Sequence, residues 1–200
     1  MRKVFNKSST KNSTWQETDM KGVIFTELLD MMDEAFSPDL TEQIIEEAEL
    51  PSGGAYTSVG TYDHREILRL VEILSRHAQV PIPDLVYSFG KHLAGRFIAT
   101  HPEFLTNAYN TFDLLSSIED HVHTEVRKLN PDAELPTFET EQPDESTLVM
   151  TYSSSRPFAD LAAGLIQGTI EHFAETIDIE RESISTHNPT IERFTLIKCS

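Results

Sequence analysis

The segment from Tyr152 to Arg156 carries a phenol, a hydroxyl and a guanidinium at every second position, on Tyr152, Ser154 and Arg156. Because successive side chains of a β-strand point to opposite faces, these three are predicted to leave one face of a strand together. Three donors converging from one short segment suit a ligand with two carboxylates or phosphates. The charge-assisted contact from Arg156 would be the strongest, contributing about 1.5–3 kcal/mol.

Histidine supplies a second kind of chemistry in this chain. The sequence contains eight histidines: His64, His77, His92, His101, His121, His123, His172 and His187. They form no His-Glu-x-x-His pair and no comparable zinc spacing. His121 and His123 flank Val122 in a predicted helix, each about 100° from it, so periodicity does not choose between them. A histidine on a metal, opposite donors for two carboxylates, makes haem a candidate ligand, because haem has one iron and two propionates.

The motifs of several enzyme classes are absent from the sequence. There is no Gly-x-Ser-x-Gly elbow for a nucleophilic serine, and Gly53-Gly54 lacks the Gly-Lys-Ser/Thr continuation of a phosphate loop. Cys199 is the only cysteine, which excludes a disulfide framework, a Cys-rich zinc site and covalent haem attachment through Cys-x-x-Cys-His. Any haem would be held non-covalently, and a reducing cytoplasmic location is consistent with the single cysteine.

The composition is that of a globular protein with an acidic surface. The 200 residues are 38% apolar and 24% charged, enough for a substantial core, and the net charge is −17. Such a surface repels phosphate backbones and anionic lipid, so we expect no nucleic-acid binding and no membrane attachment. No stretch approaches the 18 continuous apolar residues of a membrane span.

Helical periodicity dominates the first two thirds of the chain. The predicted helices run from Met20 to Ala35, from Leu40 to Leu50, from His64 to His77, from Pro83 to about Thr100, and as one long element from about Asn107 to Leu129. Prolines and glycines between these segments separate the helices from one another.

The period changes to that of strands after Pro131. Strands are predicted at 137–141, 147–154, 177–185 and 193–198, with a helix from Phe158 to Ile177 between the two hairpins. This pattern predicts an α+β fold, with a helical N-terminal lobe and a C-terminal lobe of four-stranded antiparallel sheet plus helices.

The first 19 residues differ in composition from the rest of the chain. Residues 1–19 are rich in Ser, Thr, Asn and Lys and carry no apolar stretch. We expect a disordered leader, or an artefact of a start placed too far upstream, so that a single domain spans 20–200.

Several short motifs, in this order and at these separations, resemble the H-NOX family, the haem nitric oxide/oxygen-binding (HNOB) domains that include the haem domain of soluble guanylate cyclase. They are Met20-Lys-Gly-Val-Ile-Phe25, Val122-His123, Leu135-Pro136, Tyr152-x-Ser154-x-Arg156 and Gly164-Leu165-Ile166-x-Gly168. The resemblance covers Met20 to Ser200. It implies a helical distal lobe and an α/β proximal lobe with non-covalent haem b between them, in a stand-alone bacterial gas sensor rather than an enzyme.

The resemblance also assigns roles to individual residues. The family's proximal iron ligand stands eight and thirteen residues before two prolines, and His123 has this relation to Pro131 and Pro136. Pro136 resembles the proline that presses on the porphyrin and keeps it out of plane. The three donors of the 152–156 segment resemble the motif that binds the propionates.

The resemblance also indicates which gas is bound, through the residues that it places on the distal side of the haem. Bound O₂ acquires negative charge and needs a hydrogen-bond donor, whereas NO binds ferrous haem without one. Family members that hold O₂ stably carry a tyrosine nine residues after the tyrosine of Y-x-S-x-R, and this chain has Leu161 there. The resemblance places further apolar residues beside it: Ile24, Leu28, Leu93 and Leu165. We therefore expect a sensor that binds NO, and also CO, and excludes O₂.

Signalling would follow from loss of the bond between iron and His123 when NO binds, with a shift of the helical lobe relative to the proximal lobe. We expect the signal to pass to a separate protein, in bacterial members commonly a histidine kinase or a diguanylate cyclase. Two other readings are a haem enzyme, which would need distal acid–base residues, and a haem-free acidic adaptor, in which Y-x-S-x-R is a polar strand edge.

Overall fold

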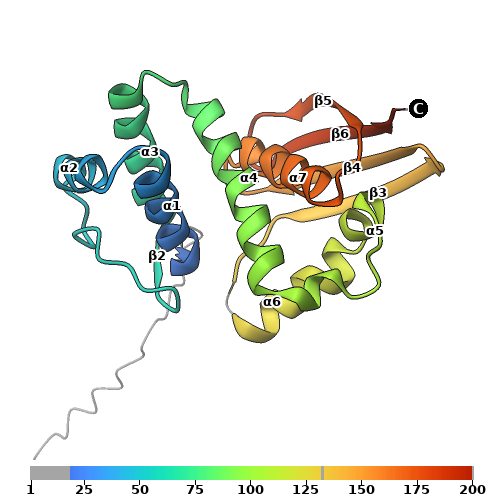
Figure 1. Ribbon diagram of the computed structural model, residues 1–200, viewed down its shortest axis with the longest axis horizontal. Coiled ribbons are helices and arrows are strands. Elements are labelled where there is room, and N and C mark those ends of the chain that lie inside the picture. The colour runs from blue at the N-terminus through green and yellow to red at the C-terminus, as the bar shows by residue number, and fades with distance from the viewer. Residues whose placement is uncertain (1–18, 132, 200) are drawn as a thin grey trace, which may run out of the picture.

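The computed structural model describes residues 19–131 and 133–199, which form a helical N-terminal lobe and a C-terminal lobe of sheet and helices (Figure 1). Of the expected leader, residues 1–18 lie outside the described residues. The α+β prediction is confirmed, and the described chain is built from two separate apolar cores.

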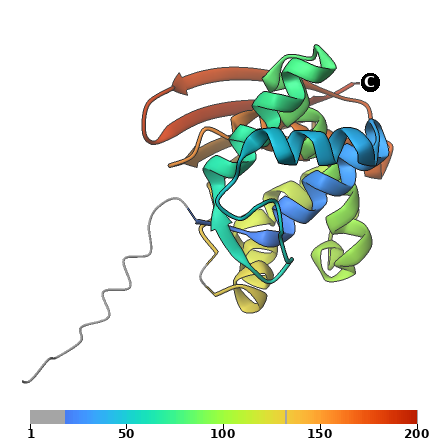
Figure 2. The ribbon, with the colours of Figure 1, turned by 90° about the vertical axis from the view of Figure 1, so that its left-hand side faces the viewer.

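Three helices and two short strands form the N-terminal lobe, which faces the viewer in Figure 2. They are β1 (Asp19–Lys21), α1 (Gly22–Ala35), α2 (Pro38–Ala48), β2 (Thr61–Asp63) and α3 (His64–Ala78). Apolar residues three and four positions apart bring one stripe of each helix inward. The fully buried ones include Phe25, Leu28, Met32, Ile44, Leu70 and Leu74. The pairing of β1 with β2 is a feature that the sequence did not predict.

Helix α4 (Ile82–Thr100) belongs to both lobes. One of its faces, with Leu85, Phe89 and Leu93, completes the core of the helical lobe. Its other face packs against α7 (Ala159–Phe173), the helix of the C-terminal lobe. A Cβ at Gly164 would overlap the carbonyl oxygen of Tyr87, so only glycine allows the two backbones to approach this closely.

The C-terminal lobe is built on one antiparallel sheet. Its strands are β3 (Thr137–Asp144), β4 (Thr147–Ser154), β5 (Ile177–Ser185) and β6 (Thr190–Lys198). Their order is β3-β4-β6-β5, which places β3 at one edge. Alternate residues of β4 and β6 turn inward and meet α7, forming the second core with Leu148, Met150, Tyr152, Phe194 and Leu196.

The long helix predicted from Asn107 to Leu129 is divided in the structure. After η1 (Pro102–Leu105) come α5 (Thr111–Ser116), a π-helical segment η2 (Ile118–Val122) and α6 (His123–Leu129). Asn110 caps α5 by accepting a hydrogen bond from the N–H of Asp113 at 3.0 Å. The change of helical pitch falls immediately before His123, and π-helical turns of this kind are frequent at functional sites.

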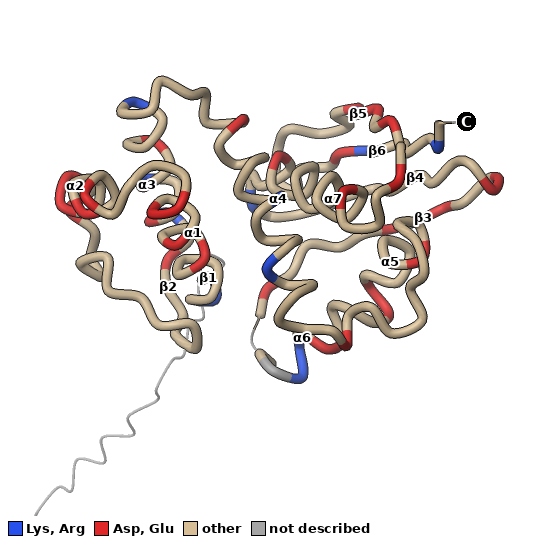
Figure 3. Tube along the Cα trace, in the orientation of Figure 1, with Lys and Arg blue, Asp and Glu red and all other residues tan. Residues whose placement is uncertain are grey.

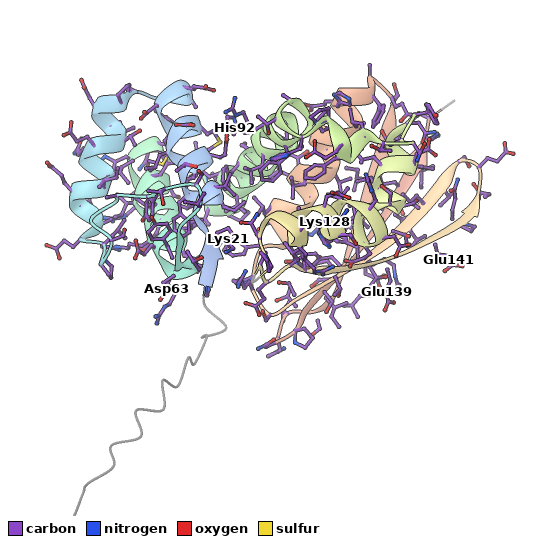
Figure 4. The ribbon with its side chains drawn as sticks, turned by 90° about the horizontal axis from the view of Figure 1, so that it is seen from below. Lys21, Asp63, His92, Lys128, Glu139 and Glu141 are labelled. Carbon is purple, nitrogen blue, oxygen red and sulfur yellow. The ribbon has the colours of Figure 1, made fainter. Side chains whose placement is uncertain are left out.

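Helix α1 contacts α4 through polar groups as well as through the apolar core. Glu27 of α1 accepts a hydrogen bond from Nε of Arg96 at 2.8 Å, and Nε2 of His92 lies 3.4 Å from the same carboxylate. In Figure 4 His92 lies between α1 and the helices of the C-terminal lobe. Glu27 is 9% exposed, so this contact lies largely inside the junction of α1 and α4.

Acidic residues outnumber basic ones in the sequence, 33 to 16, and Figure 3 marks Asp and Glu along α2, β3 and β5. Glu139 and Glu141 of β3 lie at the end of the molecule far from the helical lobe (Figure 4). Within the described ranges, no helix is both long and apolar enough to cross a membrane.

Candidate haem-binding site

A cavity of about 800 Å³ lies between the two lobes, and its walls are mostly apolar. The helical lobe contributes residues of β1 and α1, and α4 and α7 line the cavity from the shared interface. The opposite wall comes from η2, α6, the 133–138 segment and the end of β4. This volume is typical of a cofactor site rather than of a packing defect.

His123 is on the cavity wall, at the first residue of α6, and is 8% exposed. Its Nδ1 lies 3.1 Å from Oε1 of Glu119, one turn earlier. Because a carboxylate only accepts, Nδ1–H is the donor, and the neutral imidazole then keeps its lone pair on Nε2. Burial lowers the pKa of His123, against the opposing effect of Glu119, so burial favours the neutral form that binds metals.

His121 has different surroundings, although it is only two residues away. Its Nε2 lies 2.7 Å from the carbonyl oxygen of Glu103 in η1, a contact in which Nε2–H donates. The cavity is lined by Val122, His123 and Val126 from this part of the chain. Geometry thus separates the two histidines that helical periodicity left equivalent.

The three donors of the 152–156 segment reach the cavity together. Tyr152 and Ser154 belong to β4, whereas Arg156 lies in the bend beyond the strand, so strict alternation ends before it. The N–H of Arg156 donates to Oγ of Ser154 at 3.1 Å, and the phenol of Tyr152 makes a long 3.5 Å contact to the carbonyl oxygen of Arg156. Burial raises the pKa of Tyr152, which keeps the phenol protonated as a donor.

Arg156 is 7% exposed and contacts Glu134. Its guanidinium donates to the carbonyl oxygen of Glu134 at 3.2 Å and forms an ion pair with the carboxylate of the same residue. Glu134 itself lines the cavity. The structure therefore places a carboxylate on this guanidinium at the cavity wall, the kind of group that a propionate would present.

Pro136 lines the cavity from the segment that leads into β3, next to Leu135. The following aromatic residue, Phe138, also lines it, with its ring 6.0 Å from the His123 ring and 5.5 Å from the Tyr152 ring between centroids. Phe138 therefore connects the histidine wall of the cavity to the donor segment.

The predicted distal residues divide into two groups. The structure brings Ile24, Leu93, Leu161 and Leu165 to the cavity wall. Leu28 is instead 1% exposed within the core of the helical lobe and is not among the lining residues. One helical turn beyond Leu93, Phe97 does line the cavity.

Sequence reasoning missed three residues beside the predicted ones: Glu119, Glu134 and Phe138. The sequence could have indicated the role of Glu119, because a carboxylate four residues before a histidine lies on the same face of a helix. The sequence contains no such indication of Glu134 and Phe138, since their positions depend on how the 133–138 segment lies against the cavity.

The donor set fits haem. A flat apolar group requires apolar walls, its iron requires a neutral imidazole, and its carboxylates require cationic and hydroxyl donors at one end. His123 can supply the imidazole, and Tyr152, Ser154 and Arg156 can supply the cationic and hydroxyl donors. All four residues line the same cavity. The residues that line the cavity therefore have the chemistry needed to hold a non-covalent iron porphyrin.

Comparisons with known proteins agree with this geometry. Residues 21–181 match the family model described as Haem-NO-binding. A comparison with curated proteins finds no significant match.

Among solved structures, the Fe(II) unliganded H-NOX protein from K. algicida is 39% identical, with a TM-score of 0.84 over 90% of this chain and 97% of that chain. The H-NOX from Shewanella woodyi in the Fe(II)CO ligation state is also 39% identical, with a TM-score of 0.77 over 90% and 95%. The H-NOX protein from S. oneidensis in the Fe(II)NO ligation state is 25% identical, with a TM-score of 0.83 over 90% and 100%. The chain therefore belongs to the Haem-NO-binding or H-NOX family, whose stand-alone members are gas-sensor domains that bind haem b non-covalently and are not enzymes.

Proposed function

We propose that residues 20–200 form a sensor of NO that discriminates against O₂ and signals to a separate protein. The observation that carries this proposal is His123, whose imidazole lies on an apolar cavity with Nδ1 held by Glu119. Haem b bound there would supply a ferrous iron, the group on which NO and CO bind. NO and CO ligation states of related H-NOX proteins support this choice of ligands.

In this proposal the protein holds the haem from three directions. Nε2 of His123 is the iron ligand, and Arg156, with Tyr152 and Ser154, binds the propionates. Pro136, which lines the same cavity, would pack against the porphyrin. Each of these residues lines the same cavity, which supports the assignment.

Selectivity rests on the apolar residues around Leu161. This residue stands where O₂-holding members carry a tyrosine, and it lines the cavity together with Ile24, Leu93 and Leu165. A leucine offers no hydrogen to a ligand that acquires negative charge, so O₂ gains nothing there, whereas NO requires no donor. We assign no distal role to Leu28, which lies in the neighbouring core.

The output is proposed to begin with release of His123. His123 begins α6, directly after the π-helical segment, and Glu119 and Phe138 connect it to β3. The helical lobe is attached through one face of α4 and through Glu27, so a change at the cavity can alter its position relative to the sheet. A partner such as a histidine kinase or a diguanylate cyclase would respond by its difference in affinity for the two arrangements.

An absorption spectrum of the purified, reduced protein in air, and then under CO and NO, tests the proposal. We expect a Soret band of five-coordinate ferrous haem that air leaves unchanged and that NO and CO shift. His123→Gly should lose this spectrum, because the imidazole is the iron ligand, whereas His121→Gly should keep it. A colourless protein that does not take up haem would favour the haem-free adaptor, and a stable ferrous-oxy spectrum would contradict the exclusion of O₂.

A further inference from the structure

Glu119 connects the histidine of the cavity to the edge of the sheet. One carboxylate oxygen, Oε1, lies 3.1 Å from Nδ1 of His123 and 2.7 Å from the backbone nitrogen of Phe138. The residue lies in η2, one turn before His123, and its side chain is 30% exposed. Both groups donate to the same oxygen, so the carboxylate is held between a helix and a strand.

The strand donor is available because of the sheet order. β3 is an edge strand, paired on one side only with β4. An edge strand has N–H groups that no neighbouring strand accepts, and Glu119 accepts the one from Phe138. This second contact fixes the carboxylate in place, which a single contact to a rotating imidazole would not do.

A fixed carboxylate on Nδ1 has a definite effect on the other nitrogen. It sets the tautomer, orients the ring toward the cavity and makes Nε2 more basic, which strengthens a bond from Nε2 to a metal. We propose that Glu119 is a positioning residue that strengthens the bond from His123 to the haem iron and so sets how readily NO breaks it. This inference rests on the proposed role of His123 as the ligand.

The test compares the iron–histidine stretching frequency in the ferrous, unliganded holoprotein by resonance Raman. Glu119→Gln keeps the shape and an acceptor oxygen but removes the negative charge, and Glu119→Ala removes both. We expect the frequency to fall from wild type to Gln and again to Ala. Conversion to the five-coordinate NO complex should accelerate in the same order, by about tenfold or more for Ala.

A matched control is available in α6, the helix that begins at His123. Glu125 carries the same charge two residues from His123, but its carboxylate contacts Nζ of Lys128 at 2.6 Å. Glu125→Gln should leave the frequency unchanged. Amide hydrogen exchange at Phe138 gives a readout that does not depend on the iron: it should accelerate in Glu119→Ala and much less in Glu119→Gln.

The outcomes separate this inference from the proposed function. A His-ligated iron with the same frequency in wild type and both Glu119 variants overturns the inference and leaves the sensor intact. An equal fall in Glu119→Gln and Glu125→Gln overturns it as well, because the effect would then be one of net charge. If the wild type shows no iron–histidine stretch, the proposed function and this inference fail together.

Discussion

At the residue scale, Leu161 decides the proposed choice between gases. It lines the cavity from α7, one turn before Leu165. A hydroxyl placed there would be a donor inside a largely apolar space, where a hydrogen bond to a charged acceptor contributes about 1.5–3 kcal/mol. The absence of a hydroxyl from this one side chain would therefore be enough to account for the proposed discrimination against O₂.

Leu161→Tyr should convert the protein into one that holds O₂. We expect a ferrous-oxy spectrum that persists in air, with O₂ dissociation slowed by about 10- to 100-fold, the range that corresponds to such a hydrogen bond. Leu161→Phe is the control, because it adds the ring without the hydroxyl. Stopped-flow measurement of O₂ release compares the two, and equal rates for Tyr and Phe would show that volume rather than hydrogen bonding controls selectivity.

At the scale of elements, the close contact between α4 and α7 fixes the wall from which Leu93 and Leu161 reach the cavity. A Cβ at Gly90 would meet the carbonyl oxygen of Leu161, and one at Gly164 would meet that of Tyr87. The contact is formed by backbone on both sides, so neither helix can yield by turning a side chain. We expect α4 and α7 to move as one unit.

Gly164→Ala should destabilise the fold by about 3 kcal/mol, because the added methyl group has no space and the helices must separate. Gly95 lies in the partner helix α4, where a Cβ added to it would meet no atom within 4 Å, and Gly95→Ala should stabilise by about 0.5–1 kcal/mol through helix propensity. Urea unfolding of the two variants measures both effects. A similar effect of both substitutions would mean that glycine acts here only through propensity.

The sequence predicted most elements and few of the contacts between them. Heptad-like spacing located α1 to α4, and alternation located the four strands, because both patterns record which side chains face a core. It did not predict the division at η2, since Val122 and Val126 continue the apolar period across the change of pitch. The resemblance placed Leu28 beside Ile24 at the cavity, since the two share one face of α1, whereas the structure buries Leu28 in the core of the helical lobe.

The site was predictable where it depends on local order along the chain. Tyr152 and Ser154 follow from strand alternation, but Arg156 lies beyond the strand end, and its approach to the cavity depends on the bend that follows. Glu134 and the edge-strand amide of Phe138 depend on tertiary folding alone.

At the scale of the whole molecule, the cavity lies where two cores meet without merging. The helical lobe packs around α1, α3 and one face of α4, and the other core lies between α7 and the sheet. Between them, residues of β1, α6 and the end of β4 line the cavity. A ligand that fills this space would therefore contribute to the cohesion of the two lobes.

Removing haem should lower the free energy of unfolding by about 4 kcal/mol when the haem concentration is about a thousand times its Kd, because only the folded chain binds it. The loss of stability should differ between elements of the fold. Hydrogen exchange should accelerate in β1, α6 and the end of β4, and remain slow in α4 and α7. Thermal unfolding with exchange mass spectrometry on the holo- and apoprotein checks this, and a uniform increase in exchange would contradict a cavity that holds the lobes together.

The contact between Arg156 and Glu134 has a consequence for how the cofactor is loaded. The guanidinium is buried, and a buried cation without a counter-ion is costly. The carboxylate that it holds belongs to Glu134, whose side chain is 44% exposed. If Arg156 binds a propionate, as proposed, an arriving propionate would replace Glu134, and Glu134 would turn outward. Insertion of the cofactor would then be an exchange of one anion for another, with a carboxylate on the arginine before and after.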